Sequence, residues 1–113
     1  MNALFKNFCK ITFIFFSFQV YAKDIKNDSL VTQGKKIYVD NCVMCHGEKG
    51  DGNGPVGKNL IPKPKHLKAY NAKQIIKILN DGKVDMMSHL KSGLTENQKE
   101  AVSQYAEKTF SSK

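Results

Sequence analysis

The residues of greatest chemical interest stand together in the segment Cys42-Val43-Met44-Cys45-His46. Two thiols on one turn can reach the two vinyl groups on one side of a porphyrin and form thioethers, while the adjacent imidazole reaches the iron. Cys-x-x-Cys-His is the attachment signature of c-type haem. We therefore expect Cys42 and Cys45 to hold one haem c covalently and His46 to be the proximal iron ligand.

The same five residues admit three other kinds of site. A redox-active Cys-x-x-Cys pair belongs between a strand and a helix of a thioredoxin-like α/β domain. A zinc site would need a fourth ligand, which His66 or His89 could supply, but the chain has no second cysteine pair at zinc-finger spacing. A disulfide between Cys42 and Cys45 would close so small a loop that its stabilisation would be slight. Each alternative explains less of the sequence than haem attachment does.

The segment before the motif has the spacing of a helix. Apolar and small residues recur on one helical face from Leu30 to Asn41, and Asp28 or Ser29 can cap its start. After the motif, the segment 47–70 carries all three prolines and five of the eight glycines, a composition that breaks both helices and strands. A loop of about two dozen residues is long for a compact domain. We expect it to wrap a cofactor that supplies part of the core.

Two further helices are expected after this loop. The segment Asn71–Asn80 has an aliphatic face, and Asp81-Gly82 can end it because glycine tolerates the conformation of a helix C-cap. Thr95 and Gln98 form a capping box that starts a last helix running to about Thr109. No segment has a convincing β-type alternation. The sequence therefore predicts an all-α fold without internal repeats.

Taken in order, these features resemble a class I monohaem cytochrome c over most of residues 23–113. The resemblance rests on the haem motif followed by Gly47, the proline-bearing loop, a methionine segment, and two helices that carry Gly34 and Tyr38 in one and Tyr105 in the other. It implies a cytochrome c-like bundle of three or four helices wrapped around one covalently attached haem. It also implies that Gly34, Tyr38 and Tyr105 meet where the N- and C-terminal helices cross.

A second axial ligand is expected on the far face of the iron. Methionine suits an electron carrier, because six-coordinate iron reorganises little on electron transfer and thioether sulfur raises the reduction potential. Met86 and Met87 are the candidates. In the family this methionine often stands eight residues before the N-cap of the last helix, which favours Met87 over Met86. Ser88 replaces the proline that usually follows it, and His89 is a further alternative that would give bis-histidine coordination.

The proximal imidazole also needs a partner for its second ring nitrogen. Metal-bound histidines usually donate this N–H to an acceptor that fixes the ring. In the family the acceptor is a proline carbonyl in the loop after the motif. Pro55, in Gly54-Pro55, is the matching position for His46, and Pro62 is a further candidate.

The first 22 residues differ from the rest of the chain. Lys6 and Lys10 precede the apolar run Ile11–Phe18. The segment Val20-Tyr21-Ala22 then places small or branched residues before a possible cleavage site. This is the layout of a secretory signal peptide, and the run is shorter than the roughly 20 apolar residues that span a membrane. We expect cleavage after Ala22 and export of the cytochrome c domain, residues 23–113, to the periplasm as a soluble or loosely membrane-associated protein. The alternative is an uncleaved N-terminal anchor.

The charge distribution suggests the kind of partner. The formal net charge is +8, and all 18 basic residues are lysine, so the bidentate arginine contacts that read guanine are missing. Sequence-specific nucleic-acid binding is therefore not expected. Four loop lysines can steer the protein toward acidic patches on a redox partner; they are Lys58, Lys63, Lys65 and Lys68. That partner would be an oxidase, a peroxidase, a reductase or a quinol-oxidising complex.

The residues outside the haem motif offer no bond-making chemistry, since they include no convincing paired-carboxylate site. We expect a monomeric one-electron carrier of a respiratory chain rather than an enzyme, with no transmembrane span in its mature form. Two other functions stay open. The chain could be the haem subunit of a multi-subunit enzyme, or a sensing haem protein in which a small gas displaces Met87.

Overall fold

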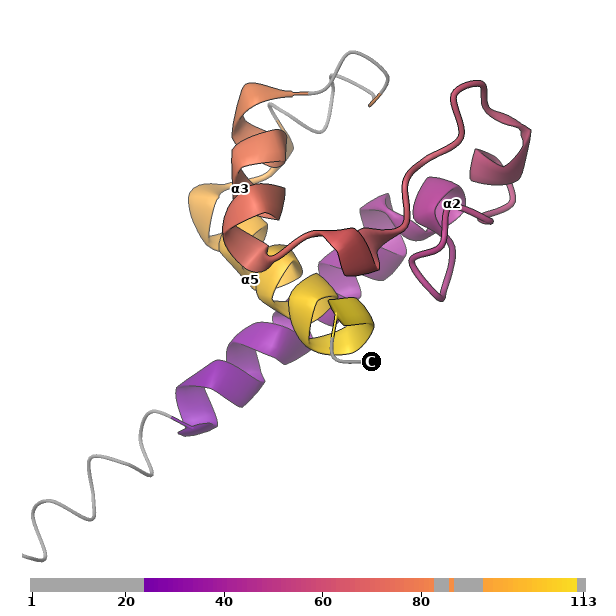
Figure 1. Ribbon diagram of the computed structural model, residues 1–113. Helices are drawn as coiled ribbons and strands as arrows, with labels where there is room; N and C mark the ends of the chain where they lie inside the picture. The colour runs from indigo at the N-terminus through magenta and orange to yellow at the C-terminus, as the bar shows by residue number, and fades with distance from the viewer. Residues whose placement is uncertain (1–23, 83–85, 87–92, 112–113) are drawn as a thin grey trace, which may run out of the picture.

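The computed structural model describes residues 24–82, 86 and 93–111, and the expected signal peptide lies outside these ranges. The elements are a helix at 24–41, α2 (Val43–His46), the 3-10 helices η1 (Gly57–Asn59) and η2 (Leu67–Ala69), α3 (Ala72–Asp81), α5 (Glu96–Ala106) and the π-helical turn η3 (Glu107–Ser111). In Figure 1, α3 lies beside α5, and α5 crosses the helix at 24–41. The described ranges contain no strand, which confirms the all-α class.

The helix before the motif begins earlier than predicted. It ends at residue 41 as expected, but residues 24–29 are already helical, so neither Asp28 nor Ser29 caps its start. Asp28 instead lies inside the helix, where its carbonyl accepts a hydrogen bond from Thr32 Oγ1 at 2.9 Å and its carboxylate pairs with Lys108 at 3.2 Å. No glycine or proline interrupts residues 24–29, so the helix can extend as a solvent-exposed turn.

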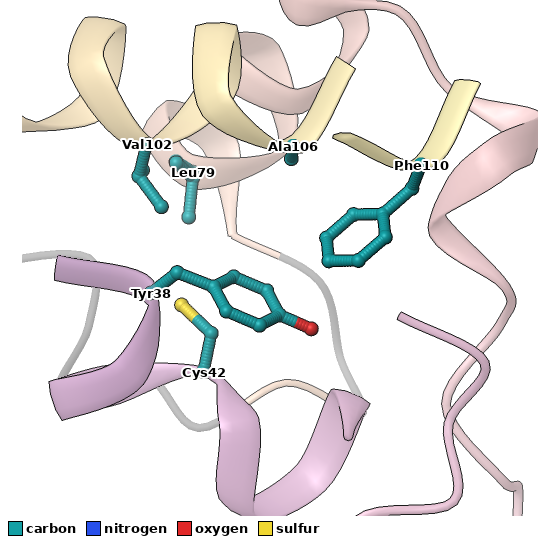
Figure 2. Close-up of a cluster of buried hydrophobic side chains, with 6 residues drawn as sticks. All are labelled: Tyr38, Cys42, Leu79, Val102, Ala106 and Phe110. Atoms are coloured by element: carbon teal, nitrogen blue, oxygen red, sulfur yellow. The ribbon is translucent and has the colours of Figure 1, made fainter. Parts of the chain in front are cut away.

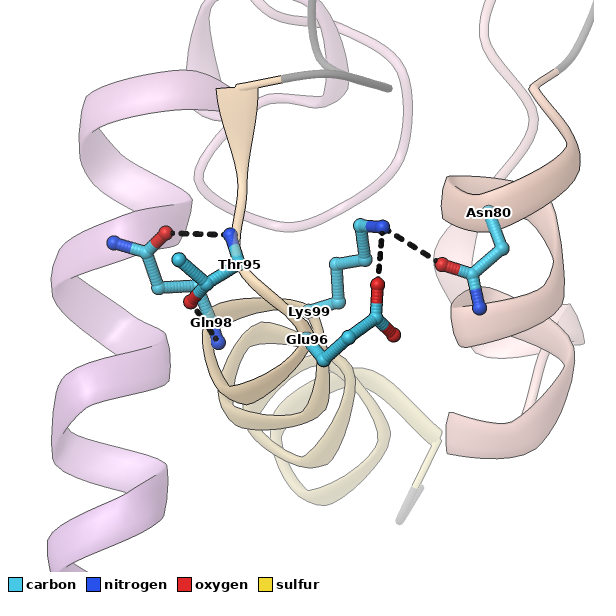
Figure 3. A network of polar contacts seen from close by, with 5 residues as sticks. All are labelled: Asn80, Thr95, Glu96, Gln98 and Lys99. Atoms are coloured by element: carbon cyan, nitrogen blue, oxygen red, sulfur yellow. Dashed lines mark hydrogen bonds and ion pairs between the residues drawn. The ribbon is translucent and has the colours of Figure 1, made fainter.

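Both helices after the loop begin with a capping box. Thr95 accepts from the backbone N–H of Gln98, and the Gln98 side chain accepts from the Thr95 N–H (Figure 3), as the sequence predicts. Asn71 and Gln74 make the same reciprocal pair at the start of α3. Gly82 ends α3 with φ +75°, which confirms the predicted glycine cap.

The last helix does not stop at Thr109. It continues as a π-helical turn to Ser111, whose hydroxyl donates to the Tyr70 carbonyl at 3.0 Å. This turn brings Phe110 against Gly50, where a Cβ atom would lie only 2.9 Å from the ring. The turn η3 therefore packs against both ends of the long loop.

The loop itself is more structured than its composition suggests. It contains the two short helices η1 and η2, a cis peptide between Ile61 and Pro62, and a hydrogen bond from Leu67 N–H to the Gly50 carbonyl at 2.7 Å. Its first part turns back onto α2, because Val56 N–H donates to the Met44 carbonyl at 2.9 Å.

The core lies where these elements meet. Figure 2 shows its six buried members, drawn from the N-terminal helix and its end, α3, α5 and η3: Tyr38, Cys42, Leu79, Val102, Ala106 and Phe110. The predicted helix crossing is confirmed. A Cβ on Gly34 would overlap the Ala101 carbonyl and would lie 2.7 Å from Tyr105 Cβ, while the rings of Tyr38 and Tyr105 are 5.5 Å apart. Only a glycine lets the two helices approach this closely.

Candidate haem site

The Cys-x-x-Cys-His motif forms one compact turn. Cys42 is the N-cap of α2, and its carbonyl accepts from Cys45 N–H at 3.2 Å and from His46 N–H at 2.9 Å. Both thiols are free. Figure 2 shows the Cys42 thiol directed toward Tyr38 and Leu79. The local fold thus brings two thiols and an imidazole onto one turn, as covalent haem attachment requires.

The two thiols lie in different surroundings. Cys42 is buried, and Cys45 is half-buried. Burial, followed by the nearby charge of Cys45, raises the pKa of the Cys42 thiol to about 12. Redox-active cysteines have a lowered pKa that favours the thiolate. Cys42 therefore lacks the lowered pKa of an attacking redox cysteine.

His46 has the properties of a metal-ligating imidazole. Burial lowers its pKa, which favours the neutral ring that binds metals. Its Nδ1 atom is buried and has no hydrogen-bond partner. A buried imidazole beside two free thiols fits a porphyrin with a central iron, and the unpaired Nδ1 is the atom that would need a hydrogen-bond acceptor once the ring binds iron.

The start of the loop, which contains Pro55, runs close to α2. Pro55 is the residue predicted to accept a hydrogen bond from His46. Gly54 N–H donates to the Cys45 carbonyl at 3.3 Å, so the Gly54-Pro55 segment lies against the motif. Neither Pro55 nor Pro62 accepts a hydrogen bond from His46 Nδ1 in this structure. The role of Pro55 therefore stays a prediction that depends on how the imidazole turns when it binds iron.

Two glycines make this close approach possible. A Cβ on Gly54 would overlap the Met44 carbonyl, and a Cβ on Gly57 would overlap the Cys45 carbonyl. From the sequence, these glycines are expected only to break helices and strands. Their spacing after the motif was a usable signal, since glycine often marks the point where two backbone segments touch.

Of the candidates for the distal ligand, the structure describes Met86. Met86 is half-buried and packs against the core. Met87, Ser88 and His89 lie outside the described residues. The choice of Met87 over Met86 and His89 remains a prediction.

Comparison with known proteins decides the family. A family profile described as "Cytochrome C oxidase, cbb3-type, subunit III" matches residues 29–105. The chain belongs to this family of c-type cytochrome domains. As a class I c-type cytochrome it binds haem c, with iron.

One curated relative gives this assignment independent support. The cytochrome is 33% identical, over 55 residues, to "Cbb3-type cytochrome c oxidase subunit FixP" of Bradyrhizobium diazoefficiens. The match covers 49% of this cytochrome and 19% of the relative, so the chain spans about a fifth of that protein's length. No solved structure matches this cytochrome.

The described residues also bear on a zinc site and on membrane-spanning helices. In the described ranges, no three His, Cys, Asp or Glu side chains are grouped so that they could hold a metal ion, so Cys42, Cys45 and His66 do not form a zinc site there. Among the same residues, no helix has both the length and the apolar character that crossing a membrane requires.

Proposed function

We propose that this cytochrome is an exported monohaem carrier that transfers one electron at a time between proteins of a respiratory chain. The observation that carries the proposal is the α2 turn, where two free thiols and one buried imidazole with an unpaired nitrogen lie together. The chain has one Cys-x-x-Cys-His motif, which supports a single haem.

Each site residue has a distinct role in this proposal. Cys42 and Cys45 form the thioethers, His46 is the proximal ligand, and Met87 is the distal ligand. The bound haem supplies an iron that accepts and releases one electron. The protein contributes a fixed, water-poor setting, since the Cys42 side chain is anchored in the core that Tyr38, Leu79 and Phe110 share. Pro55 would accept the second ring proton of the ligated imidazole.

The partner is proposed to be an acidic redox protein, first of all an oxidase. The support is the segment 44–68, which comprises most of α2 and the loop after it and carries several exposed apolar and basic side chains. Its apolar members are Met44, Val56, Leu60 and Ile61, and its lysines are Lys58, Lys63, Lys65 and Lys68. Apolar contact with surrounding positive charge suits a transient electron-transfer complex, in which charge speeds association.

A second candidate is a haem subunit that stays bound to an oxidase. Its support is the printed name of the relative, which is an oxidase subunit, together with the exposed apolar residues in the same segment. Copurification separates the two candidates. A shuttle elutes as a monomer and separates from membranes in moderate salt, whereas a subunit remains with the oxidase.

Export is proposed from the N-terminal 22 residues. Mass determination of the protein recovered from the periplasm tests this directly. A chain that begins at Lys23 supports cleavage after Ala22, and one that retains residues 1–22 indicates an anchor.

The experiment that tests the function is a redox titration of the exported protein together with three variants. The wild type should carry one covalent haem that survives denaturation and should titrate as a one-electron couple. His46→Ala should lose most of its assembled haem, and the paired change Cys42→Ala with Cys45→Ala should lose all covalent haem. Met44→Leu, a change at an exposed position inside the motif, is the matched control and should behave as wild type. Covalent haem in the double alanine variant would contradict the proposal.

A further inference from the structure

The peptide that follows the proximal histidine is held on both sides. Gly47 ends α2 with φ +79° and ψ 165°, and its N–H donates to the Val43 carbonyl at 2.8 Å. The Gly47 carbonyl accepts from Gly50 N–H at 3.2 Å and from the Tyr38 hydroxyl at 2.6 Å. The hydroxyl bond is the shorter of the two and comes from a different element, the helix at 24–41.

Tyr38 makes hydrogen bonds at the start of the haem motif and directly after its end. Its backbone carbonyl accepts from Cys42 N–H at 2.8 Å, at the first residue of the motif. Its side-chain hydroxyl donates to Gly47, the residue directly after His46. One residue therefore contacts the chain both at the start of the motif and directly after its end.

The Tyr38 side chain is itself held firmly. It is 2% exposed, and its ring lies 5.5 Å from that of Tyr105 and 5.3 Å from that of Phe110. Figure 2 shows the ring between Cys42 and Phe110, with its hydroxyl at the edge of the core. Packing thus sets where the hydroxyl points, and the hydrogen bond to Gly47 costs little additional conformational entropy.

In this structure, the orientation of the His46 imidazole depends on the hydrogen bonds of the backbone around it. The His46 N–H donates to the Cys42 carbonyl at 2.9 Å, and its carbonyl accepts from Gly52 N–H at 2.9 Å. Its Nδ1 atom has no partner that would fix the ring directly. The hydrogen bonds around residues 46–47 therefore determine how the ring leaves the helix, and Tyr38 provides the side-chain bond among them.

We propose that Tyr38 is a positioning residue for the proximal iron ligand, which acts by holding the Gly47 carbonyl and thereby setting the plane of the His46 imidazole. This rests on the proposed role of His46. A phenylalanine at this position would keep the ring contacts with Tyr105 and Phe110 but would leave the buried Gly47 carbonyl with a single donor. The hydroxyl, and not the ring, is the part that positions the ligand.

The test compares Tyr38→Phe with Tyr105→Phe, both assembled with haem. The two changes each remove one hydroxyl from the same aromatic cluster, but only the first touches Gly47. The readout is the set of haem methyl resonances in the proton NMR spectrum of the oxidised protein, which depends on the orientation of the axial imidazole. The reduction potential and the free energy of unfolding are measured on the same samples.

The expected result is a changed order or spacing of the haem methyl resonances and a shifted potential in Tyr38→Phe, with a wild-type pattern in Tyr105→Phe. If Tyr38→Phe loses stability but keeps the wild-type resonances, the hydroxyl is only structural and the positioning role is overturned. If wild type itself lacks covalent haem, the proposed function fails first and the positioning role with it.

A second substitution covers the case in which Tyr38→Phe does not assemble. Replacing Tyr38 by 3-fluorotyrosine keeps the ring and the hydroxyl but makes the hydroxyl a stronger donor. The haem methyl resonances should then shift without loss of haem. Unchanged resonances in this variant would overturn the positioning role.

Discussion

At the scale of single residues, Lys99 places a positive charge in the contact between α3 and α5. Its side chain is 8% exposed, and its ammonium group donates to Asn80 and to Glu96, each at 2.8 Å (Figure 3). A buried charge is tolerated only when such hydrogen bonds replace its lost hydration. Asn80, on α3, is thus a link between two helices that sequence periodicity does not reveal.

Removing that link should cost stability. We expect Asn80→Ala to lower the free energy of unfolding by about 1.5–3 kcal/mol, because it takes a partner from a buried charged donor. Glu96→Gln should cost less than about 1 kcal/mol, because that carboxylate is 77% exposed. Chemical denaturation of both variants measures the difference. Equal losses would mean that the buried charge does not depend on α3.

The turn at Asp51 should make stability depend on pH. Its carboxylate accepts from the backbone N–H and the side-chain amide of Asn53, both at 3.0 Å, and these bonds lower its pKa. Since the folded pKa lies below the unfolded one, the contribution is complete above the unfolded pKa and disappears as the pH falls through the folded pKa. The stability difference between wild type and Asp51→Asn should therefore shrink as the pH falls from about 5 to 3.

Unfolding at several pH values checks this, with Asp40→Asn as an exposed control outside the turn. A difference that stays constant over that range would refute the role given to Asp51.

At the scale of elements, the crossing of the N-terminal helix and α5 depends on one glycine. Gly34→Ala places a methyl group where the Ala101 carbonyl already lies, so the helices must separate. We expect a loss of about 1–3 kcal/mol or more in the free energy of unfolding. Gly93→Ala is the matched control, since a Cβ there meets nothing within 4 Å; it should leave stability unchanged or raise it by up to about 1 kcal/mol. Similar effects of the two changes would rule out the close crossing.

The sequence predicts elements best where the signal is local. The box of Thr95 and Gln98, the glycine end of α3 and the five-residue haem motif are each encoded in a few consecutive residues, and the structure confirms the two helix boundaries. The start of the N-terminal helix was predicted wrongly, because Asp28 resembles a cap but contacts Lys108, 80 positions away. The π-helical turn of residues 107–111 was missed for the same reason: it depends on tertiary contacts of Phe110 and Ser111.

In the candidate haem site, too, the local signals could be predicted from the sequence and the tertiary contacts could not. The motif residues could be found by spacing alone, whereas the bond from Tyr38 to Gly47 needs the helix phase, the turn geometry and the aromatic packing together. The distal ligand stays a prediction, because Met87 lies outside the described residues.

At the scale of the whole molecule, the cofactor should be part of the core. Among the residues that the structure describes, the buried apolar cluster has six members, and one of them is Cys42, which is proposed to attach the haem. A domain with so small a core usually needs a covalent or metal link to fold cooperatively. We expect the variant with Cys42→Ala and Cys45→Ala, made without haem, to lose most of its helical circular dichroism and its cooperative unfolding transition. If the chain without haem were fully helical and unfolded cooperatively, the packing of the helices alone would be sufficient for folding, and the haem would not be needed as part of the core.

In the proposed function, the iron is held by two protein ligands and serves only to carry electrons. The most direct measurement is the optical spectrum of the exported protein, oxidised, then reduced, then reduced under carbon monoxide. We predict the bands of low-spin, six-coordinate haem c in both oxidation states, unchanged by the gas, because His46 and Met87 are the proposed ligands at the two axial positions. A spectral shift on adding carbon monoxide would contradict this account, since it would mean an open or displaceable sixth position and a sensing or catalytic function.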